Sequence, residues 1–343
     1  MSGTERLAAD AAGVARAAEL LRAGRVVALP TETVYGLAAR ADDPAAVRRI
    51  FAAKGRPPDN PLIVHVPDPA AVTMVAATLT PLARDLLARF APGPLTVVLP
   101  ARGDLPRGTT GGLDTVAVRI PDHPLMQQVL AACGLPLAAP SANRSGRPSP
   151  TTAAHVLADL DGRVDAVLDG GPTRIGLEST VVDTRGDVPV VLRDGAVTRE
   201  DLGLRPFEPD DAAGSGSERT GVRAPGTRHP HYAPALPVHV LPAATAGERA
   251  AALAAAAGPD AVVGLIAPDA AAGPGVRPLG RPADAAALGA ALFGLLRSAE
   301  EAGLTAVAVA AVPPVGIGRA VMDRLHRAAV ASGGEDLVGG ASA

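Results

Sequence analysis

The chain has 343 residues, of which 48% are hydrophobic and 20% are charged, a composition typical of globular proteins and not of disordered ones. Its net charge of −3 excludes a global attraction to nucleic acid or anionic membranes, so any site for a polyanion must be local. The single cysteine, Cys133, excludes an internal disulfide framework and a cysteine-based zinc site.

Residues 1–205 are predicted to form one domain that mixes strands and helices. Helices are predicted over residues 10–23, 44–54, about 80–91, 124–133 and from Thr151 or Thr152 onward. Strands are predicted over residues 26–29, 62–66, 95–99, 116–120, 135–139, 166–168, 179–182 and 188–193. Because strands outnumber helices and some follow one another directly, we expect a twisted mixed sheet with packed helices.

A second, smaller domain is predicted over residues 236–343. Strands at 238–241, 261–266 and 306–310 alternate with helices at 246–257, 283–301 and 318–332. This alternation predicts a Rossmann-like, three-layer α/β domain.

Residues 206–235 are predicted to be a linker that also acts as a lid. Proline stiffens its second part, which carries Arg223, Arg228 and Tyr232. Tyr232 is therefore expected to close over a bound nucleotide; the alternative is that it only ties the linker down. The N-terminus has no signal-peptide pattern and no apolar run reaches the ~20 residues of a membrane span, so a cytoplasmic protein is expected.

Lys54 is unusual because it is the only lysine among 32 basic positions. A compact ammonium cannot be replaced by a planar guanidinium at a tight site, which points to a specific role. Alternatively, Lys54 only places a cation at the C-terminus of the helix 44–54. The two asparagines, Asn60 and Asn143, and the tyrosine Tyr35 also lie in polar, loop-like segments.

Several familiar sites are absent from the sequence. It contains no phosphate-binding loop of the Walker type, no nucleophile elbow and no zinc-protease motif, and the pair Gly316 and Gly318 lacks the third glycine of a dinucleotide fingerprint. What remains are cations and small donors at predicted strand ends: Lys54, Arg56, Arg119, Arg193, Thr33, Ser141, Asn143, Ser149 and Ser179. Such a set suits polyphosphate and carboxylate binding, with catalysis by positioning and charge neutralisation.

Three further polar residues leave alternatives open. His65 lies inside an apolar strand and is either a satisfied core histidine or a ligand-binding group. Glu32 and Glu178 are either surface charges or, beside phosphate-binding cations, groups that help to hold Mg²⁺.

Several independent motifs together resemble the YrdC-like threonylcarbamoyl-AMP synthases. In the first half these are Pro30–Leu37 (PTETVYGL), Lys54–Pro57 (KGRP), Asn60–Leu62 (NPL), Pro140–Asn143 (PSAN) with Ser145 and Gly146, and Ser179–Val181 (STV). The second half, with Ala224–Gly226 (APG), His231–Pro234 (HYAP) and Gly318–Leu325 (GRAVMDRL), resembles the C-terminal domain of the two-domain form of this family.

The resemblance implies a nucleotidyltransferase that makes L-threonylcarbamoyladenylate from L-threonine, bicarbonate and ATP, releasing pyrophosphate. A separate tRNA threonylcarbamoyl transferase would use the product, and Mg²⁺ would accompany ATP. The implied threonine-binding residues are Thr33, His65, Arg119, Ala139 and Ser179. The implied ATP-binding residues are Lys54, Arg56, Asn60, Thr115, Ser141, Asn143, Ser149, Arg193 and Tyr232, with Lys54 and Arg56 as the catalytic cations.

Two alternative functions are weighed. One is an RNA-binding module, against which the net charge of −3 and the 2% aromatic content argue, although a weak RNA contact is compatible with them. The other is a carbamoyltransferase of the hydrogenase-maturation type, which would need cysteine zinc modules that one cysteine cannot build.

Overall fold

The computed structural model describes residues 3–204 and 232–338, so most of the predicted linker and lid, residues 206–231, lies outside the described residues. The chain divides into two compact units, Met1–Ser145 with Ser149–Arg228, and Gly146–Pro148 with His229–Ala343. In the described ranges, no helix combines the length and the hydropathy that a bilayer-spanning segment needs.

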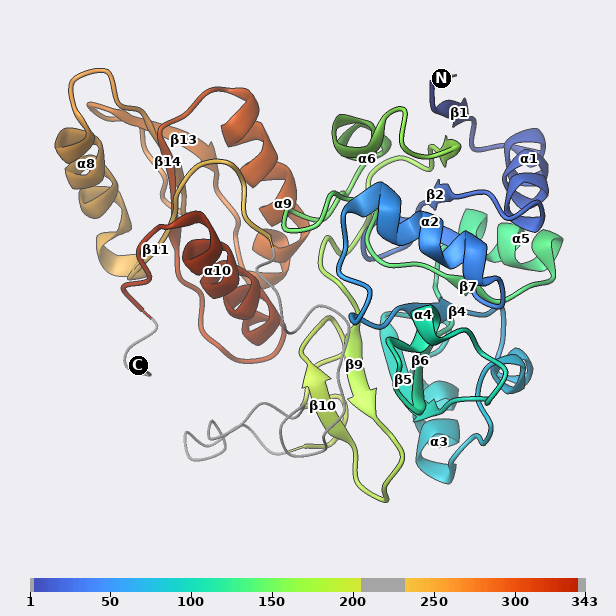
Figure 1. Ribbon diagram of the computed structural model, residues 1–343. Helices are drawn as coiled ribbons and strands as arrows, with labels where there is room; N and C mark the ends of the chain where they lie inside the picture. The colour runs from blue at the N-terminus through green and yellow to red at the C-terminus, as the bar shows by residue number, and fades with distance from the viewer. Residues whose placement is uncertain (1–2, 205–231, 339–343) are drawn as a thin grey trace. The chain divides into compact units, whose positions relative to one another are not determined.

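The first unit is built on a mixed sheet whose described strands run in the order β1-β8-β2-β3-β7-β4-β6-β5-β9-β10 (Figure 1). The strands are β1 (Glu5–Leu7), β2 (Val27–Leu29), β3 (Gly36–Arg40), β4 (Ile63–His65), β5 (Leu95–Pro100), β6 (Thr115–Arg119), β7 (Leu137–Ala138), β8 (Ala166–Leu168), β9 (Thr180–Asp183) and β10 (Val190–Arg193). The helices are α1 (Ala11–Arg22), α2 (Pro44–Lys54), the 3₁₀ turn η1 (Ala70–Met74), α3 (Pro81–Phe90), α4 (Arg107–Thr110), α5 (Pro124–Cys133) and α6 (Ala153–Leu160).

Side-chain alternation sends the strand residues of this unit into separate cores. Val27 and Leu29 of β2 pack in the core that contains the buried residues of α1 and α5, whereas Ala28 packs in the core of α2, α3 and α6. Helices therefore cover both faces of the sheet around β2. Around β6, Ala117 belongs to a small core to which only strands contribute buried residues. This core lies on the face opposite Val116 and Val118.

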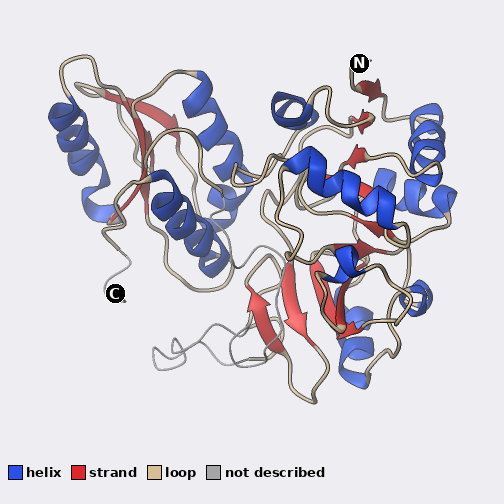
Figure 2. Cartoon of the chain, viewed as in Figure 1, coloured by secondary structure: helices blue, strands red, loops and turns tan. Residues whose placement is uncertain are grey.

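The second unit is a smaller parallel sheet in the order β11-β14-β12-β13, with helices on both faces (Figures 1 and 2). Its elements are β11 (Val238–Leu241), η3 (Ala243–Thr245), α8 (Ala246–Ala257), β12 (Val263–Ile266), β13 (Val276–Gly280), α9 (Ala285–Glu301), β14 (Ala306–Ala310) and α10 (Gly318–Ser332). Both predicted architectures, the mixed sheet with packed helices and the Rossmann-like three-layer domain, are confirmed.

Local capping explains why the predicted helices begin where they do. Asp43 caps α2 through its carboxylate, which accepts from Ala45 N at 2.8 Å, and Pro44 occupies the first helical position. The helix ends at Gly55, which adopts the left-handed φ of 63°. Lys54 is therefore the last residue of α2 and is fixed by the turn that follows.

Candidate functional site

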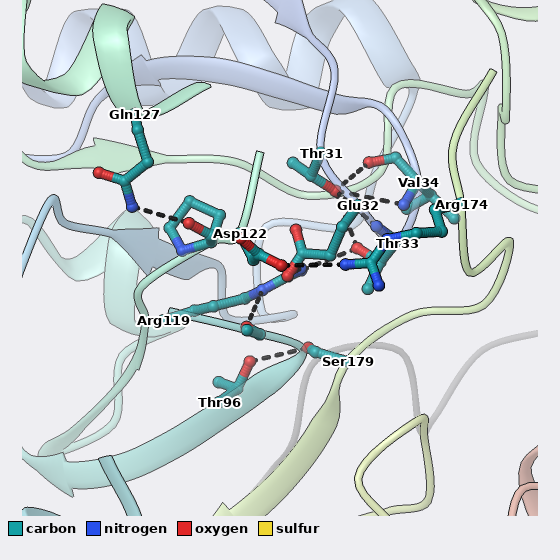
Figure 3. A network of polar contacts seen from close by, with 12 residues as sticks. Thr31, Glu32, Thr33, Val34, Thr96, Arg119, Asp122, Gln127, Arg174 and Ser179 are labelled. Atoms are coloured by element: carbon teal, nitrogen blue, oxygen red, sulfur yellow. Dashed lines mark hydrogen bonds and ion pairs between the residues drawn. The ribbon is translucent and has the colours of Figure 1, made fainter. Parts of the chain in front are cut away.

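Arg119, the last residue of β6, is the centre of a buried polar network (Figure 3). Its Nη1 donates to Thr33 Oγ1 at 2.9 Å and its Nε donates to the carbonyl of Gly93 at 3.3 Å. Its Nη2 lies 2.7 Å from Oε1 of Glu32, and the two side chains are only 5% and 2% exposed. The ion pair between Glu32 and Arg119 shows that Glu32 is not a surface charge.

The turn between β2 and β3 holds Glu32 and Thr33 in place. The hydroxyls of Thr31 and Thr33 lie 2.9 Å apart inside the turn. A second segment stabilises it from outside, because Ile175 N donates to the carbonyl of Glu32 at 2.8 Å and Gly176 N donates to that of Thr33 at 3.1 Å. The side chains that face Arg119 are therefore carried on a backbone that is fixed from two sides.

Ser179 lies directly before β9 and is hydrogen-bonded to Arg193, which connects a predicted threonine-binding residue with a predicted ATP-binding residue. Its Oγ lies 2.8 Å from Oγ1 of Thr96, and Nη2 of Arg193 donates to this Oγ at 3.2 Å. Arg193 also donates to the carbonyl of Ser179 from Nε and Nη2, at 3.1 and 2.9 Å. Thr96 was not among the predicted site residues; its signal was a hydroxyl inside an otherwise apolar strand.

His65 is a buried, neutral histidine beside Arg119. It ends β4, where its backbone is paired with Arg119 of β6 and Leu137 of β7. Burial, and next the charge of Arg119, lower its pKa from 6.5 to about 3. Its Nδ1 is buried and has no hydrogen-bond partner among the described residues. A neutral imidazole with an unused nitrogen is suited to a hydroxyl group of a ligand.

The lowered pKa of His65 predicts a specific loss of stability in acid. Because the folded state resists protonation that the unfolded state accepts, the free energy of unfolding should fall as pH decreases from 6.5 toward 3. The slope from this group approaches about 1.4 kcal/mol per pH unit. Urea unfolding between pH 4.5 and 6.5 should therefore be less pH-dependent in His65→Gln than in the wild type, and equal slopes would contradict a buried neutral histidine.

Lys54 directs its ammonium at a ring of oxygen atoms. Nζ donates to the carbonyls of Ser141 and Asn143 at 2.6 and 2.5 Å, and Oδ1 of Asn143 lies 3.4 Å away. Burial, followed by the charge of Arg56, lowers the pKa of Lys54 well below its usual value. An anionic ligand at this point would favour the charged ammonium again.

The loop after β7 brings Ser141 and Asn143 to Lys54. Ser141 Oγ donates to Oδ1 of Asn143 at 2.5 Å, and Ala142 N donates to the carbonyl of Tyr35 at 2.8 Å. Ser141 also forms a β-bridge with Gly36, at the end of the turn that carries Thr33. One turn therefore borders both the Arg119 network and the Lys54 ring.

The other predicted site residues of the first unit are buried on neighbouring elements. Arg56 donates from Nη2 to the carbonyl of Pro61 at 3.1 Å, and Ala139 N donates to the carbonyl of Ile63 at 2.9 Å. Ser149 Oγ donates to Oε1 of Glu178 at 2.5 Å. Asn60 and Thr115 are 5% and 4% exposed.

A contact of Glu32 or Glu178 with Mg²⁺, one of the two alternatives for these residues, stays a prediction. Glu32 is engaged with Arg119, and the described residues hold no cluster of three or more acidic, histidine or cysteine side chains that could bind a metal. The donor set fits a metal that arrives with a polyphosphate, and no protein ligand is assigned.

Tyr232 belongs to the second unit. Its ring stacks on Phe293 of α9, with the centroids 5.3 Å apart, and Cζ of Arg324 lies 5.7 Å from the ring. Tyr232 has a positive φ of 69°, which is uncommon for a residue other than glycine. Its expected contact with ATP stays a prediction.

Comparisons with known proteins agree with both halves of the chain. Residues 19–195 match the family model of the Sua5, YciO and YrdC proteins, described as "Telomere recombination". Residues 196–330 match the model described as "Threonylcarbamoyl-AMP synthase, C-terminal domain".

Individual relatives match over nearly the whole length. The chain is 41% identical over 344 residues to the threonylcarbamoyl-AMP synthase of Bacillus subtilis, which covers 95% of each chain. The solved structure of Pyrococcus abyssi Sua5 complexed with L-threonine has a TM-score of 0.87 and 38% identity, and covers 97% of this chain and 99% of its own. These matches confirm the resemblance seen in the motifs: the chain belongs to the threonylcarbamoyl-AMP synthase family, in its two-domain form.

Proposed function

We propose that the chain makes L-threonylcarbamoyladenylate from L-threonine, bicarbonate and ATP, with release of pyrophosphate. Membership of the synthase family supports the reaction, and the family's product serves threonylcarbamoyl-adenosine formation in tRNA. The observation that carries the proposal is the buried contact of Arg119 with Thr33, which offers a guanidinium and a hydroxyl to a small carboxylate.

The Arg119 network is the proposed threonine site. The related Pyrococcus abyssi protein was solved with L-threonine, which supports threonine as the amino acid. In the proposal, Arg119 and Thr33 bind the carboxylate, His65 accepts from the hydroxyl, and Ser179 and the backbone at Ala139 complete the site. Threonine would then be held by its carboxylate and by its side-chain hydroxyl, and the hydroxyl distinguishes it from most other amino acids.

The Lys54 ring and its neighbours are the proposed ATP site. The amine adds to the carbon of CO₂ with loss of a proton, or to that of bicarbonate with loss of water. The resulting carbamate oxygen then attacks the α-phosphorus as pyrophosphate leaves. Each step gathers negative charge, which Lys54, Arg56 and Arg193 would offset from fixed positions. Mg²⁺ bound to the phosphates would supply further charge neutralisation.

Pyrophosphate release from ATP tests the proposal. We expect release to require L-threonine, bicarbonate and Mg²⁺ together, and to stop when any one is omitted or when EDTA is added. Release that continues without threonine would overturn the proposal. Glycine in place of threonine serves as a control for the amino acid specificity.

The alternative functions receive no comparable support. Cys133 is buried, so it offers nothing to the zinc modules of the hydrogenase-maturation carbamoyltransferases. A direct RNA contact, and transfer of the product to a tRNA threonylcarbamoyl transferase, stay predictions. A gel shift with tRNA at moderate salt tests the first.

A further inference from the structure

Glu32 is a buried carboxylate whose hydrogen-bonding capacity is only partly used. Its Oε1 lies 2.7 Å from Nη2 of Arg119, but the two groups are not aligned as a hydrogen bond, and Oε2 has no hydrogen-bond partner among the described residues. A carboxylate can accept about four hydrogen bonds, and burying one without them costs several kcal/mol. Oε2 can therefore accept a further, well-aligned donor.

Arg119 does not supply the missing donors. Its Nη1 and Nε are directed to neutral oxygens, the hydroxyl of Thr33 and the carbonyl of Gly93, and only Nη2 approaches Glu32. If Glu32 served only as a counter-ion for Arg119, a forked pair of parallel N–H···O bonds would be the favoured geometry. The observed arrangement instead leaves a cation and an anion side by side with a single close contact between them (Figure 3).

We propose that Glu32 binds the α-amino group of threonine and takes one of its protons before the amine reacts. This inference rests on the proposed function. The zwitterion of an α-amino acid carries its carboxylate and its ammonium on the same carbon, and Arg119 and Glu32 present the opposite charges side by side. Glu32 would thus be a catalytic residue that the sequence motifs did not assign.

The proton transfer balances within the pair. An N–H bond of the ammonium breaks, its electron pair stays on nitrogen as the lone pair, and the proton moves to Oε2. A neutral amine and a neutral carboxylic acid replace two buried charges, which a low-dielectric site favours. The lone pair is then available to form the bond to the carbon of bicarbonate or CO₂.

Binding of the substrate would itself prepare Glu32 for this step. Burial raises the pKa of Glu32, but the charge of Arg119 and the polar contacts of Glu32 with Arg119 and with the backbone of Asp122 outweigh burial, so the pKa lies below its usual value. When the substrate carboxylate shares the guanidinium, less of that charge stabilises Glu32, and the pKa should rise toward the value that burial favours. The base is therefore ionised before threonine arrives and becomes a better proton acceptor afterwards.

Other titratable groups around Glu32 are accounted for. His65 on β4 is kept neutral, with a pKa of about 3. Burial also lowers the pKa of His123, the residue before α5. Asp122 pairs with Arg174 at 2.9 Å on the exposed side. Arg119 is therefore the charged group that competes with a substrate ammonium for Glu32.

The binding test compares L-threonine with β-hydroxybutyrate, which keeps the carboxylate and hydroxyl but lacks the amine. By calorimetry, wild-type protein should bind the analogue at least about tenfold more weakly, as expected for the loss of a charge-assisted hydrogen bond. In Glu32→Gln this preference should fall below about threefold. A Glu32→Gln protein that keeps the full preference would overturn the inference.

The kinetic test uses the pH dependence of pyrophosphate release. Glu32→Gln should lower kcat/KM for threonine by about 10²- to 10⁴-fold, the usual contribution of a general base. Because the variant must wait for free amine, the ratio of its rate to the wild-type rate should rise about tenfold per pH unit between pH 6 and 8. Taking the ratio removes the effect of pH on bicarbonate.

Two controls separate this role from a structural one. Asp122→Asn removes a neighbouring carboxylate that already has a partner, and should leave both readouts unchanged. Glu32→Asp keeps the charge and should recover part of the rate if Glu32→Gln is poorly folded. A pH-independent ratio would overturn the base role. Failure of the proposed function would look different, since wild-type protein would then release no threonine-dependent pyrophosphate.

Discussion

Replacing Lys54 by arginine is expected to lower the turnover of pyrophosphate release about 100-fold, although the charge is kept. The ammonium lies among three oxygens at 2.5 to 3.4 Å, two of them carbonyls of the loop after β7. A planar guanidinium is too wide for this ring, so it would displace either the loop or its own charge from the proposed phosphate site. Turnover at saturating substrates is the measurement, and circular dichroism checks the fold.

A matched exchange elsewhere in the chain controls for the side-chain swap itself. Arg22 lies in the last turn of α1, and its Nη1 donates to the carbonyl of Ala132 at 3.0 Å, so it also serves a helix C-terminus. Arg22→Lys should keep wild-type turnover. If Lys54→Arg also does so while folded, Lys54 only completes its helix and the specific role is refuted.

The polar residues that the structure brings together could be predicted because chemistry restricts their types. Lys54 stood out by its rarity, and the ring of oxygens around its ammonium is the physical reason to expect that arginine cannot replace it. Arg119 was placed by alternation along β6, which sends Val116 and Val118 to one core and Ala117 to another. In each case the signal was local, within a strand or within one turn of a helix.

The strands that were missed lack a local signal. β3 has the sequence GLAAR, with no β-branched residue, and is a strand because it is buried between β2 and β7. β13 contains Pro278, which is tolerated because this strand pairs only with β12, at the edge of its sheet. Burial between neighbouring strands explains why β3 is a strand, and the position at the sheet edge explains why β13 can contain a proline.

The contact between Glu32 and Arg119 could not be predicted for a different reason. The hydrogen bond from Arg119 to Thr33 spans 86 positions and depends on how β2, β4 and β6 are ordered in the sheet. No pattern in one sequence states that order. The sequence motif indicated the turn that carries Glu32, and alternation along β6 indicated the face on which Arg119 lies. Only the assembled sheet places the Glu32 carboxylate beside the Arg119 guanidinium.

Arg119→Ala is expected to raise the KM for threonine about 10- to 150-fold, which corresponds to losing a charge-assisted pair worth about 1.5–3 kcal/mol. The KM for ATP should change less than about threefold, because Lys54 and Arg193, the cations proposed to bind the phosphates, are unchanged. Removal of the cation also leaves Glu32 buried without its counter-charge, which should destabilise the fold by about 3–5 kcal/mol.

The two effects of Arg119→Ala can be separated by a second substitution. Adding Glu32→Gln removes the buried carboxylate that has lost its counter-charge. The double variant should therefore regain most of the unfolding free energy, measured in urea, while its KM for threonine stays raised. Arg174→Ala breaks another arginine–carboxylate pair, but an exposed one with side chains 69% and 51% accessible, and should alter neither property. If Arg119→Ala raised the KM for both substrates equally in the stabilised double variant, Arg119 would not be the partner of the threonine carboxylate. Glu32→Gln alone is the reference for this comparison, because it changes threonine binding by itself. A further, threonine-selective rise in KM from Glu32→Gln to the double variant would assign carboxylate recognition to Arg119.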